Sequence, residues 1–175
     1  LAQDALQKTA DEMADLYNQA PCGYHSIDEN GIFTKINDTE LKWLGYTREE
    51  VVGKMRITDI LTEPARKKFE ESFDYFKHDD GSIREIEYEI QRRDGSRFLA
   101  LASSRALFDA KGKFLQSHTS LYDVTEAREF QKAVGDSEIR YRQMFENHSA
   151  VQFIADPEIG VLVDATPAAA AFYGY

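Results

Sequence analysis

The amino-acid sequence predicts an α+β fold, in which a five-stranded antiparallel sheet has helices on one face and an amphipathic helix at each end. Three observations lead to this prediction. Apolar residues make up 42% of the 175 residues, which is enough for a packed core. Two short strand patterns precede a group of helical patterns, and three longer strand patterns follow that group. A single antiparallel sheet with helices on one face buries the apolar side of all these elements.

Residues 1–20 are predicted to form the first helix, because apolar and small side chains recur at alternating spacings of four and three residues. This heptad seam consists of Ala2, Leu6, Thr9, Met13, Leu16 and Ala20. Pro21 ends the helix, since proline lacks the N–H that a helix interior requires.

Two short strands are expected at residues 23–27 and 32–36, joined by the turn Asp28-Glu29-Asn30-Gly31. Asn-Gly favours the positive φ angles of a tight hairpin turn. Asn37 can cap the helix that follows, which stops at Gly45. Thr47, with Glu50 three residues later, forms the capping box of another short helix.

A longer helix begins at Pro64, and its apolar side chains follow at helical spacing: Ala65, Phe69, Phe73 and Phe76. The period then changes to two, because Ile86, Tyr88 and Ile90 alternate with glutamates. Such alternation is typical of a strand with one buried and one solvated face. Turns at 94–95 and 109–112 lead to two further strands, at 98–108 and 114–122.

The helix from Val124 onward has a second heptad seam, formed by Ala127, Phe130, Val134, Ser137, Tyr141 and Met144. Gly135 and Ser137 are expected to weaken this helix midway. We interpret the two flanking helices as parallel contacts of a homodimer. The alternative is that both helices pack on their own domain.

The chain also repeats part of itself. Residues 17–28 parallel 145–156 at an offset of 128, and residues 31–33 parallel 160–162 at an offset of 129. At the second offset Gly45-Tyr46 matches Gly174-Tyr175. We therefore predict that a second copy begins near residue 141 and is cut short. That remnant is expected to be poorly ordered or to pack on a neighbouring molecule.

Charge and composition exclude several classes of protein. The chain has 21 basic and 31 acidic residues, a net charge of −10, which argues against a nucleic-acid partner. Cys22 is the only cysteine, so a disulfide framework is excluded. No apolar run is long enough to span a membrane, and a cytoplasmic location is expected.

Several motifs in order resemble those of the PAS domain family, a sensory module of signalling proteins. They include the Asp28-Glu29-Asn30-Gly31 turn, Leu44-Gly45-Tyr46, Gly53-Lys54 and the hairpin Arg93-Asp94-Gly95-Ser96. The closing segment Asp123-Val124-Thr125-Glu126 is similar to the family's junction into an output helix. The resemblance implies a PAS sensory domain at 21–126 after the amphipathic helix at 1–20. It also implies a signalling helix at 127–140 and the truncated start of a second PAS domain at 141–175.

The resemblance further implies a ligand pocket between the sheet and the helices. Its candidate walls are His25, Ile27, Trp43, Phe73, Phe76, Tyr88, Ser103, Thr119 and Leu121. For His25, a packed core position remains the alternative, since the repeat has Phe153 there. An error of one residue in strand register would move several of these side chains to the other face.

The signal junction is assigned to Asp123, Thr125 and Glu126. Asp123 or Thr125 can satisfy free N–H groups at the helix start, and Glu126 lies in the first turn, where the helix dipole favours a carboxylate. A shift of the last strand could then tilt or rotate the helix that follows.

The function implied is a sensory PAS module of a cytoplasmic signalling protein that binds a small ligand or partner, dimerises, and relays the signal to downstream domains. A sensor histidine kinase is the expected parent, and a diguanylate cyclase is the alternative. A PAS domain with a packed interior that acts only in dimerisation or spacing is a rival. No metal site is recognised, and haem or flavin is not expected, because Cys22 lies before the first strand and no suitable His lies on the long helix.

No catalytic motif is recognised either. A small α+β enzyme, such as an isomerase or hydratase, would need a buried carboxylate or a His–Asp pair. Neither is expected on an apolar face, so no enzyme is predicted within this chain.

Overall fold

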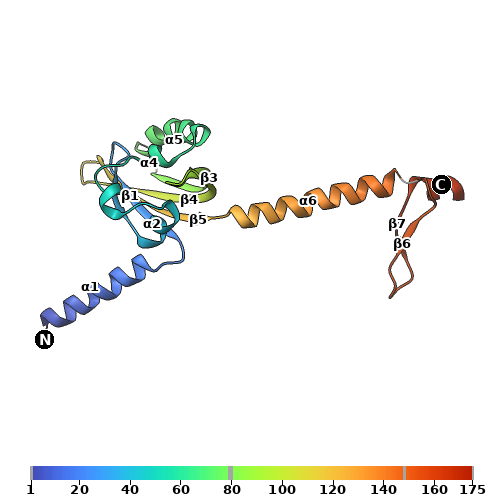
Figure 1. The fold of residues 1–175 in the computed structure, drawn as a ribbon, viewed down its shortest axis with the longest axis horizontal. Helices are drawn as coiled ribbons and strands as arrows, with labels where there is room; N and C mark the ends of the chain where they lie inside the picture. Colours follow the sequence, from blue (N-terminus) through green and yellow to red (C-terminus); the bar gives the residue numbers. More distant parts are fainter. Residues whose placement is uncertain (1, 79–80, 148, 175) are drawn as a thin grey trace. The chain divides into compact units, whose positions relative to one another are not determined.

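A computed structural model of the chain describes residues 2–78, 81–147 and 149–174 (Figure 1). These residues form two compact units, Leu1–Thr125 and Glu126–Tyr175, and each is described by itself. The first contains α1 (Ala2–Asn18), β1 (Gly23–Ile27), β2 (Phe33–Ile36), α2 (Asp38–Leu44), α3 (Arg48–Val51), α4 (Ile57–Ile60), α5 (Glu63–Phe76), β3 (Ser82–Gln91), β4 (Arg97–Phe108) and β5 (Phe114–Asp123). The elements that follow are α6 (Thr125–Glu146), β6 (Phe153–Ala155), β7 (Leu162–Ala165) and α7 (Pro167–Tyr173).

The strands of the first unit form one antiparallel sheet in the order β2-β1-β5-β4-β3. Alternate side chains of these strands are buried with apolar residues of α2, α4 and α5 in a single core. The other face carries exposed polar residues such as Lys35, Arg105 and His118. The predicted fold class, a five-stranded antiparallel sheet with helices on one face, is therefore confirmed.

The predicted turn and cap residues have the predicted roles. Gly31 adopts a φ of 77° in the turn between β1 and β2. Gly45 ends α2 in the left-handed region, with a φ of 78°. Glu50 Oε2 accepts a hydrogen bond from the Thr47 backbone N–H at 2.9 Å, which completes the capping box of α3. These local signals fix where each helix begins and ends.

Asn37 is fully buried, and its side chain joins α1, β1 and α2. Its Oδ1 accepts from the backbone N–H groups of Tyr24 and Glu40, both at 3.0 Å. Its Nδ2 donates to the carbonyl oxygens of Tyr17 at 2.9 Å and Cys22 at 3.0 Å. The cap of α2 therefore also holds the end of α1 and the start of β1.

β3 departs from the regular alternation that the sequence predicts. Its register with β4 shifts between Ile83 and Ile86, and Glu85 has a φ of 53°. The Glu85 N–H donates to Ser103 Oγ at 3.2 Å instead of to a ladder carbonyl. A bulge at Glu85 thus interrupts the row of glutamates, while Tyr88 and Ile90 remain buried as predicted.

The flanking helices leave their apolar seams exposed. α6 is continuous through Gly135 and Ser137, so the weakness predicted there does not break it, and none of its described side chains is buried. Exposed members of the two seams are Leu6, Met13, Leu16, Phe130, Val134, Tyr141 and Met144. The side chain of Ala2 lies outside the described residues. Within the part of the chain that is described, no helix combines the length and apolar character needed to cross a membrane.

The second unit repeats the local structure around Asn37. β6 and β7 form an antiparallel hairpin, and Thr166 stands at the position of Asn37. Thr166 Oγ1 accepts from the N–H groups of Gln152 at 3.1 Å and Ala169 at 3.2 Å, and it donates to the Ala150 carbonyl at 3.0 Å. The sequence repeat therefore corresponds to a structural repeat. Tyr175, which aligns with Tyr46, lies outside the described residues.

Asn37→Ala is expected to destabilise the first unit by about 2–4 kcal/mol, because it leaves two N–H groups and two carbonyl groups without their partner. Asn37→Thr, which introduces the residue of the second copy, should cost less, since a hydroxyl can serve the same two N–H groups. Urea denaturation measures both changes, with Asn147→Ala, an exposed residue in the turn after α6, as the control. A loss for Asn37→Ala no larger than for Asn147→Ala would contradict the assigned role.

Candidate functional site

A cavity of about 40 Å³ lies between the inner face of the sheet and the helices α4 and α5. Its wall is mainly apolar, and the rings of Phe69, Phe73 and Phe76 stack along α5 on one side of it. Seven residues predicted as pocket walls line it: His25, Ile27, Phe73, Phe76, Tyr88, Thr119 and Leu121. Strand alternation and helical spacing therefore bring these residues together. Their contact with a ligand stays a prediction.

Ser103 and Trp43, also predicted as pocket walls, do not line this cavity. Ala102 and Ser104 face the cavity from β4, so Ser103 between them points to the opposite face of the sheet. Trp43 is half-buried near the end of α2, where its ring packs edge-on against Phe98 at 6.2 Å. For these two residues the prediction disagrees with the structure.

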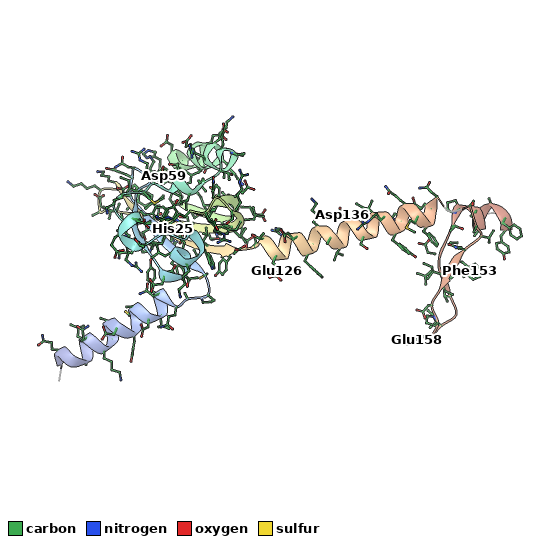
Figure 2. The ribbon with its side chains drawn as sticks, viewed as in Figure 1. His25, Asp59, Glu126, Asp136, Phe153 and Glu158 are labelled. Carbon is green, nitrogen blue, oxygen red and sulfur yellow. The ribbon has the colours of Figure 1, made fainter. Side chains whose placement is uncertain are left out.

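His25 on β1, labelled in Figure 2, forms a buried pair with Glu40 on α2. The distance from His25 Nδ1 to Glu40 Oε1 is 2.8 Å, and the side chains are 3% and 0% exposed. The other carboxylate oxygen, Oε2, is also buried and has no hydrogen-bond partner among the described residues. Gly23 makes room for the carboxylate, because a Cβ at that position would lie 3.1 Å from Glu40 Oε2.

The expectation that no buried carboxylate lies on an apolar face is therefore wrong, and this carboxylate is paired with a histidine. Glu40 was missed because it occupies the first turn of α2, where acidic residues are usually solvated and favoured by the helix dipole. One signal could have indicated its burial. Glu40 lies four residues before Leu44, on the same helical face, and Leu44 is fully buried.

The second copy lacks both members of the pair. At the offsets of the repeat, Phe153 stands at the position of His25 and Ala169 at that of Glu40. Ala169 is buried at the start of α7, as Glu40 is in α2, and its N–H donates to the capping side chain of Thr166 as the Glu40 N–H donates to Asn37. The local structure therefore forms without the pair.

The charge of Glu40 affects the pKa of Tyr17 on α1. Burial is the main cause that raises the pKa of Tyr17 to about 12, and the negative charge of Glu40 adds to it. The Tyr17 hydroxyl donates to the Tyr24 carbonyl at 3.1 Å. The end of α1 is thus in electrostatic contact with the pair.

The cavity, as packed in this structure, has room for a few water-sized groups and not for a haem or flavin ring, since cofactor pockets usually exceed about 300 Å³. Among the described residues, no group of three or more His, Cys, Asp or Glu side chains is arranged to hold a metal ion.

The predicted junction forms a hydrogen-bonded clamp between β4 and the start of α6. The Leu99 N–H donates to Thr125 Oγ1 at 2.9 Å, and the Val124 N–H donates to the Leu99 carbonyl at 2.9 Å. Asp123 Oδ1 accepts from the Thr125 N–H at 3.0 Å, as a cap would. Thr125 therefore serves a strand N–H and not a helical one. Glu126 lies exposed in the first turn of α6.

Arg92, which sequence reasoning missed, connects α2 to this junction. Its guanidinium donates to the Trp43 carbonyl, lies 4.2 Å above the ring of Phe98, and contacts Asp123 Oδ2 at 3.5 Å. No sequence signal identifies it, because its partners lie on three separate elements.

Comparison with known proteins gives one family and several structural neighbours. The model of the PAS domain family matches residues 21–126. The phosphoserine phosphatase RsbP of Bacillus subtilis is 31% identical over 93 residues, which are 53% of this chain. The match spans only 23% of the length of that curated relative.

Solved PAS structures share the fold. The PAS domain of an HTR-like protein from Haloarcula marismortui has a TM-score of 0.59 at 20% identity, covering 70% of this chain and 97% of that chain. A sensory box histidine kinase/response regulator from Burkholderia thailandensis has a TM-score of 0.58 at 18% identity, covering 73% of this chain and 95% of that chain. At such identities the likeness concerns the fold alone.

His25→Phe or Glu40→Ala alone is expected to destabilise the first unit by about 3 kcal/mol, because each leaves a buried polar partner unpaired. The double variant, which carries the residues of the second copy, should be more stable than His25→Phe alone. A double-mutant cycle by urea denaturation measures the coupling. Additive single effects would contradict the assignment of a coupled pair.

Proposed function

This chain belongs to the PAS domain family, and from that premise we propose that residues 21–126 are the sensory module of a cytoplasmic signalling protein. The module responds to a small ligand or partner at the cavity and relays the response through α6 to downstream domains. The observation that carries this proposal is the clamp at Leu99, Val124 and Thr125, which joins the sheet to the first turn of α6.

One route to the clamp runs through the sheet. His25 pairs in register with Thr119 on β5, and both line the cavity. β5 ends at Asp123, which accepts from the Thr125 N–H. A shift of β5 on ligand binding therefore reaches α6 without an intervening flexible segment.

A second route runs through α2. Glu40 links this helix to the cavity through His25, and the helix ends near Trp43, whose carbonyl accepts from Arg92. Arg92 in turn contacts Asp123. Both routes meet at the start of α6, which supports a relay to that helix.

Three classes of output domain fit this relay. A sensor histidine kinase is the first choice, in keeping with neighbours of that class, and a diguanylate cyclase is the alternative. The relative RsbP, named as a phosphatase, adds a phosphatase output. The rival role, dimerisation or spacing without a ligand, predicts that no small molecule copurifies, which mass spectrometry of the denatured protein tests.

We also propose that residues 141–175 are the start of a second PAS domain and that α1 and α6 form homodimer contacts. The first proposal is supported by the hydrogen bonds that Thr166 shares with Asn37. The second is supported by the heptad spacing of exposed apolar residues along both helices.

Thr125→Val is expected to speed hydrogen exchange of the Leu99 amide by about tenfold or more, because the variant removes its acceptor. Faster exchange should extend into the first turn of α6. NMR-detected exchange measures this. Thr34→Val on β2, which removes a hydroxyl that donates to the Ser26 carbonyl, is the matched control.

The proposed relay also predicts the result of a second hydrogen-exchange experiment. A variant with His25→Phe and Glu40→Ala should change exchange at Leu99 and in the first turn of α6. It should leave the amides of β6 and β7 unchanged. If this variant exchanges like the wild type at Leu99 and Thr125, the relay is wrong.

Phe130→Glu combined with Val134→Glu should dissociate the dimer, because it places charges in the apolar seam of α6. Light scattering should then report the 20.0 kDa mass of one chain in place of twice that mass. Lys132→Glu, outside the seam, is the control and should leave the dimer intact. A wild-type monomer at high concentration would refute the proposed contacts.

A further inference from the structure

The ring of His25 offers one free polar atom to the cavity. Its Nδ1 contacts Glu40, which is not part of the cavity wall, whereas His25 itself lines the cavity. No described residue forms a hydrogen bond with Nε2. The serine and threonine hydroxyl groups in the wall are engaged, whereas the buried Tyr88 hydroxyl has no hydrogen-bond partner among the described residues.

The serine and threonine hydroxyl groups of the cavity wall have partners within the sheet. Ser104 Oγ and Thr119 Oγ1 lie 2.8 Å apart, and Ser117 Oγ accepts from the Ile27 N–H at 3.3 Å. Apart from these residues, His25 and Tyr88, the wall is apolar. A ligand in this cavity would therefore meet two unengaged polar groups among the described wall residues, His25 Nε2 and the Tyr88 hydroxyl.

The burial of the pair decides which kind of polar contact Nε2 makes. A net negative charge on the pair would be costly, because both side chains are excluded from water and Glu40 Oε2 has no hydrogen-bond partner among the described residues. An imidazolium with a carboxylate, or an imidazole that accepts from a carboxylic acid at Oε1, avoids that charge. In both arrangements the shared proton lies between Nδ1 and Oε1 and Nε2 carries a proton, which makes Nε2–H available as a hydrogen-bond donor.

We propose that the His25–Glu40 pair is the recognition element for a small carbonyl or carboxylate compound, whose oxygen accepts from Nε2–H while its apolar part fills the cavity. This inference rests on the proposed sensory function and names the ligand class for it. The volume of about 40 Å³ holds a compound of about four heavy atoms without rearrangement of α5.

Comparison of the two copies indicates that the local fold does not depend on the pair. The second copy has Phe153 and Ala169 in place of the pair, and its strand, cap and helix still form. The strand, the cap and the start of the helix therefore do not require the pair, which leaves the pair free for a role in binding.

Acetate and acetone are the probes, because they have the same shape and differ in charge. Ligands of this size bind in the millimolar range at best, so a titration to about 100 mM is required, with sodium chloride matched in ionic strength. Amide NMR spectra of the 175-residue chain should show saturable shifts at His25, Ser104 and Thr119 with at least one probe.

Matched variants test the role of the pair. His25→Phe combined with Glu40→Ala should weaken binding at least tenfold, whereas Ser103→Ala on the opposite face of the sheet should bind as the wild type does. Should the double variant not fold, a nuclear Overhauser contact between the probe methyl group and the His25 ring protons in the wild type supports the site. The absence of saturable shifts with both probes, or equal binding by a folded double variant, would overturn the inference.

Failure of the relay would look different. If a probe binds at His25 but leaves the amides of Leu99 and Thr125 unshifted, the ligand site is supported and the relay is wrong. If the hydrogen-exchange experiments support the relay but neither probe binds, only the assignment of the ligand class is wrong.

Discussion

The buried side chain of Asn37 is the point on which the rest of the first unit depends. Its four hydrogen bonds hold the end of α1, the start of β1 and the first turn of α2 in one arrangement. Each partner is a backbone group that would otherwise be buried without a bond, which is costly. Because α2 is fixed against β1 in this way, Glu40 is held opposite His25. The second copy keeps the same construction with Thr166, so it is a property of the repeated motif and not of the cavity.

Unlike the hydrogen bonds of Asn37, the His25–Glu40 pair has no counterpart in the second copy. A buried ion pair contributes little net stability compared with apolar side chains of similar size, so its presence calls for another reason. Its position supplies one, because the pair lies between the cavity and α2, and α2 leads through Arg92 to Asp123. The cavity is mainly apolar, so its few unengaged polar groups, His25 Nε2 and the Tyr88 hydroxyl, would select among small molecules by their hydrogen bonds.

Much of the fold could be predicted from the sequence, because local signals and periodicity determine it. Asn37, Gly45 and the Thr47–Glu50 box mark helix ends through contacts with near neighbours in the chain. The inward faces of β1 and β5 follow from alternation. The same local signals reveal the repeat, since the strand, turn and cap residues recur at offsets of 128 and 129.

What the sequence did not reveal depends on contacts between distant elements. Glu40 is buried because Gly23, on another element, leaves space for its carboxylate. Arg92 has partners on α2, β4 and β5, which only the folded chain brings together. Ser103 faces away from the cavity because the register of β4, fixed by pairing, points its neighbours inward. None of these facts is encoded in a local pattern.

The protonation state of His25 tests the account most directly, since recognition through a donor requires a proton on Nε2. Long-range ¹H–¹⁵N NMR of the imidazole at neutral pH distinguishes a protonated from an unprotonated Nε2. The account predicts a protonated Nε2 in the wild-type protein, with an Nδ1 signal that changes in Glu40→Gln. An unprotonated Nε2, with its lone pair free toward the cavity, would contradict it.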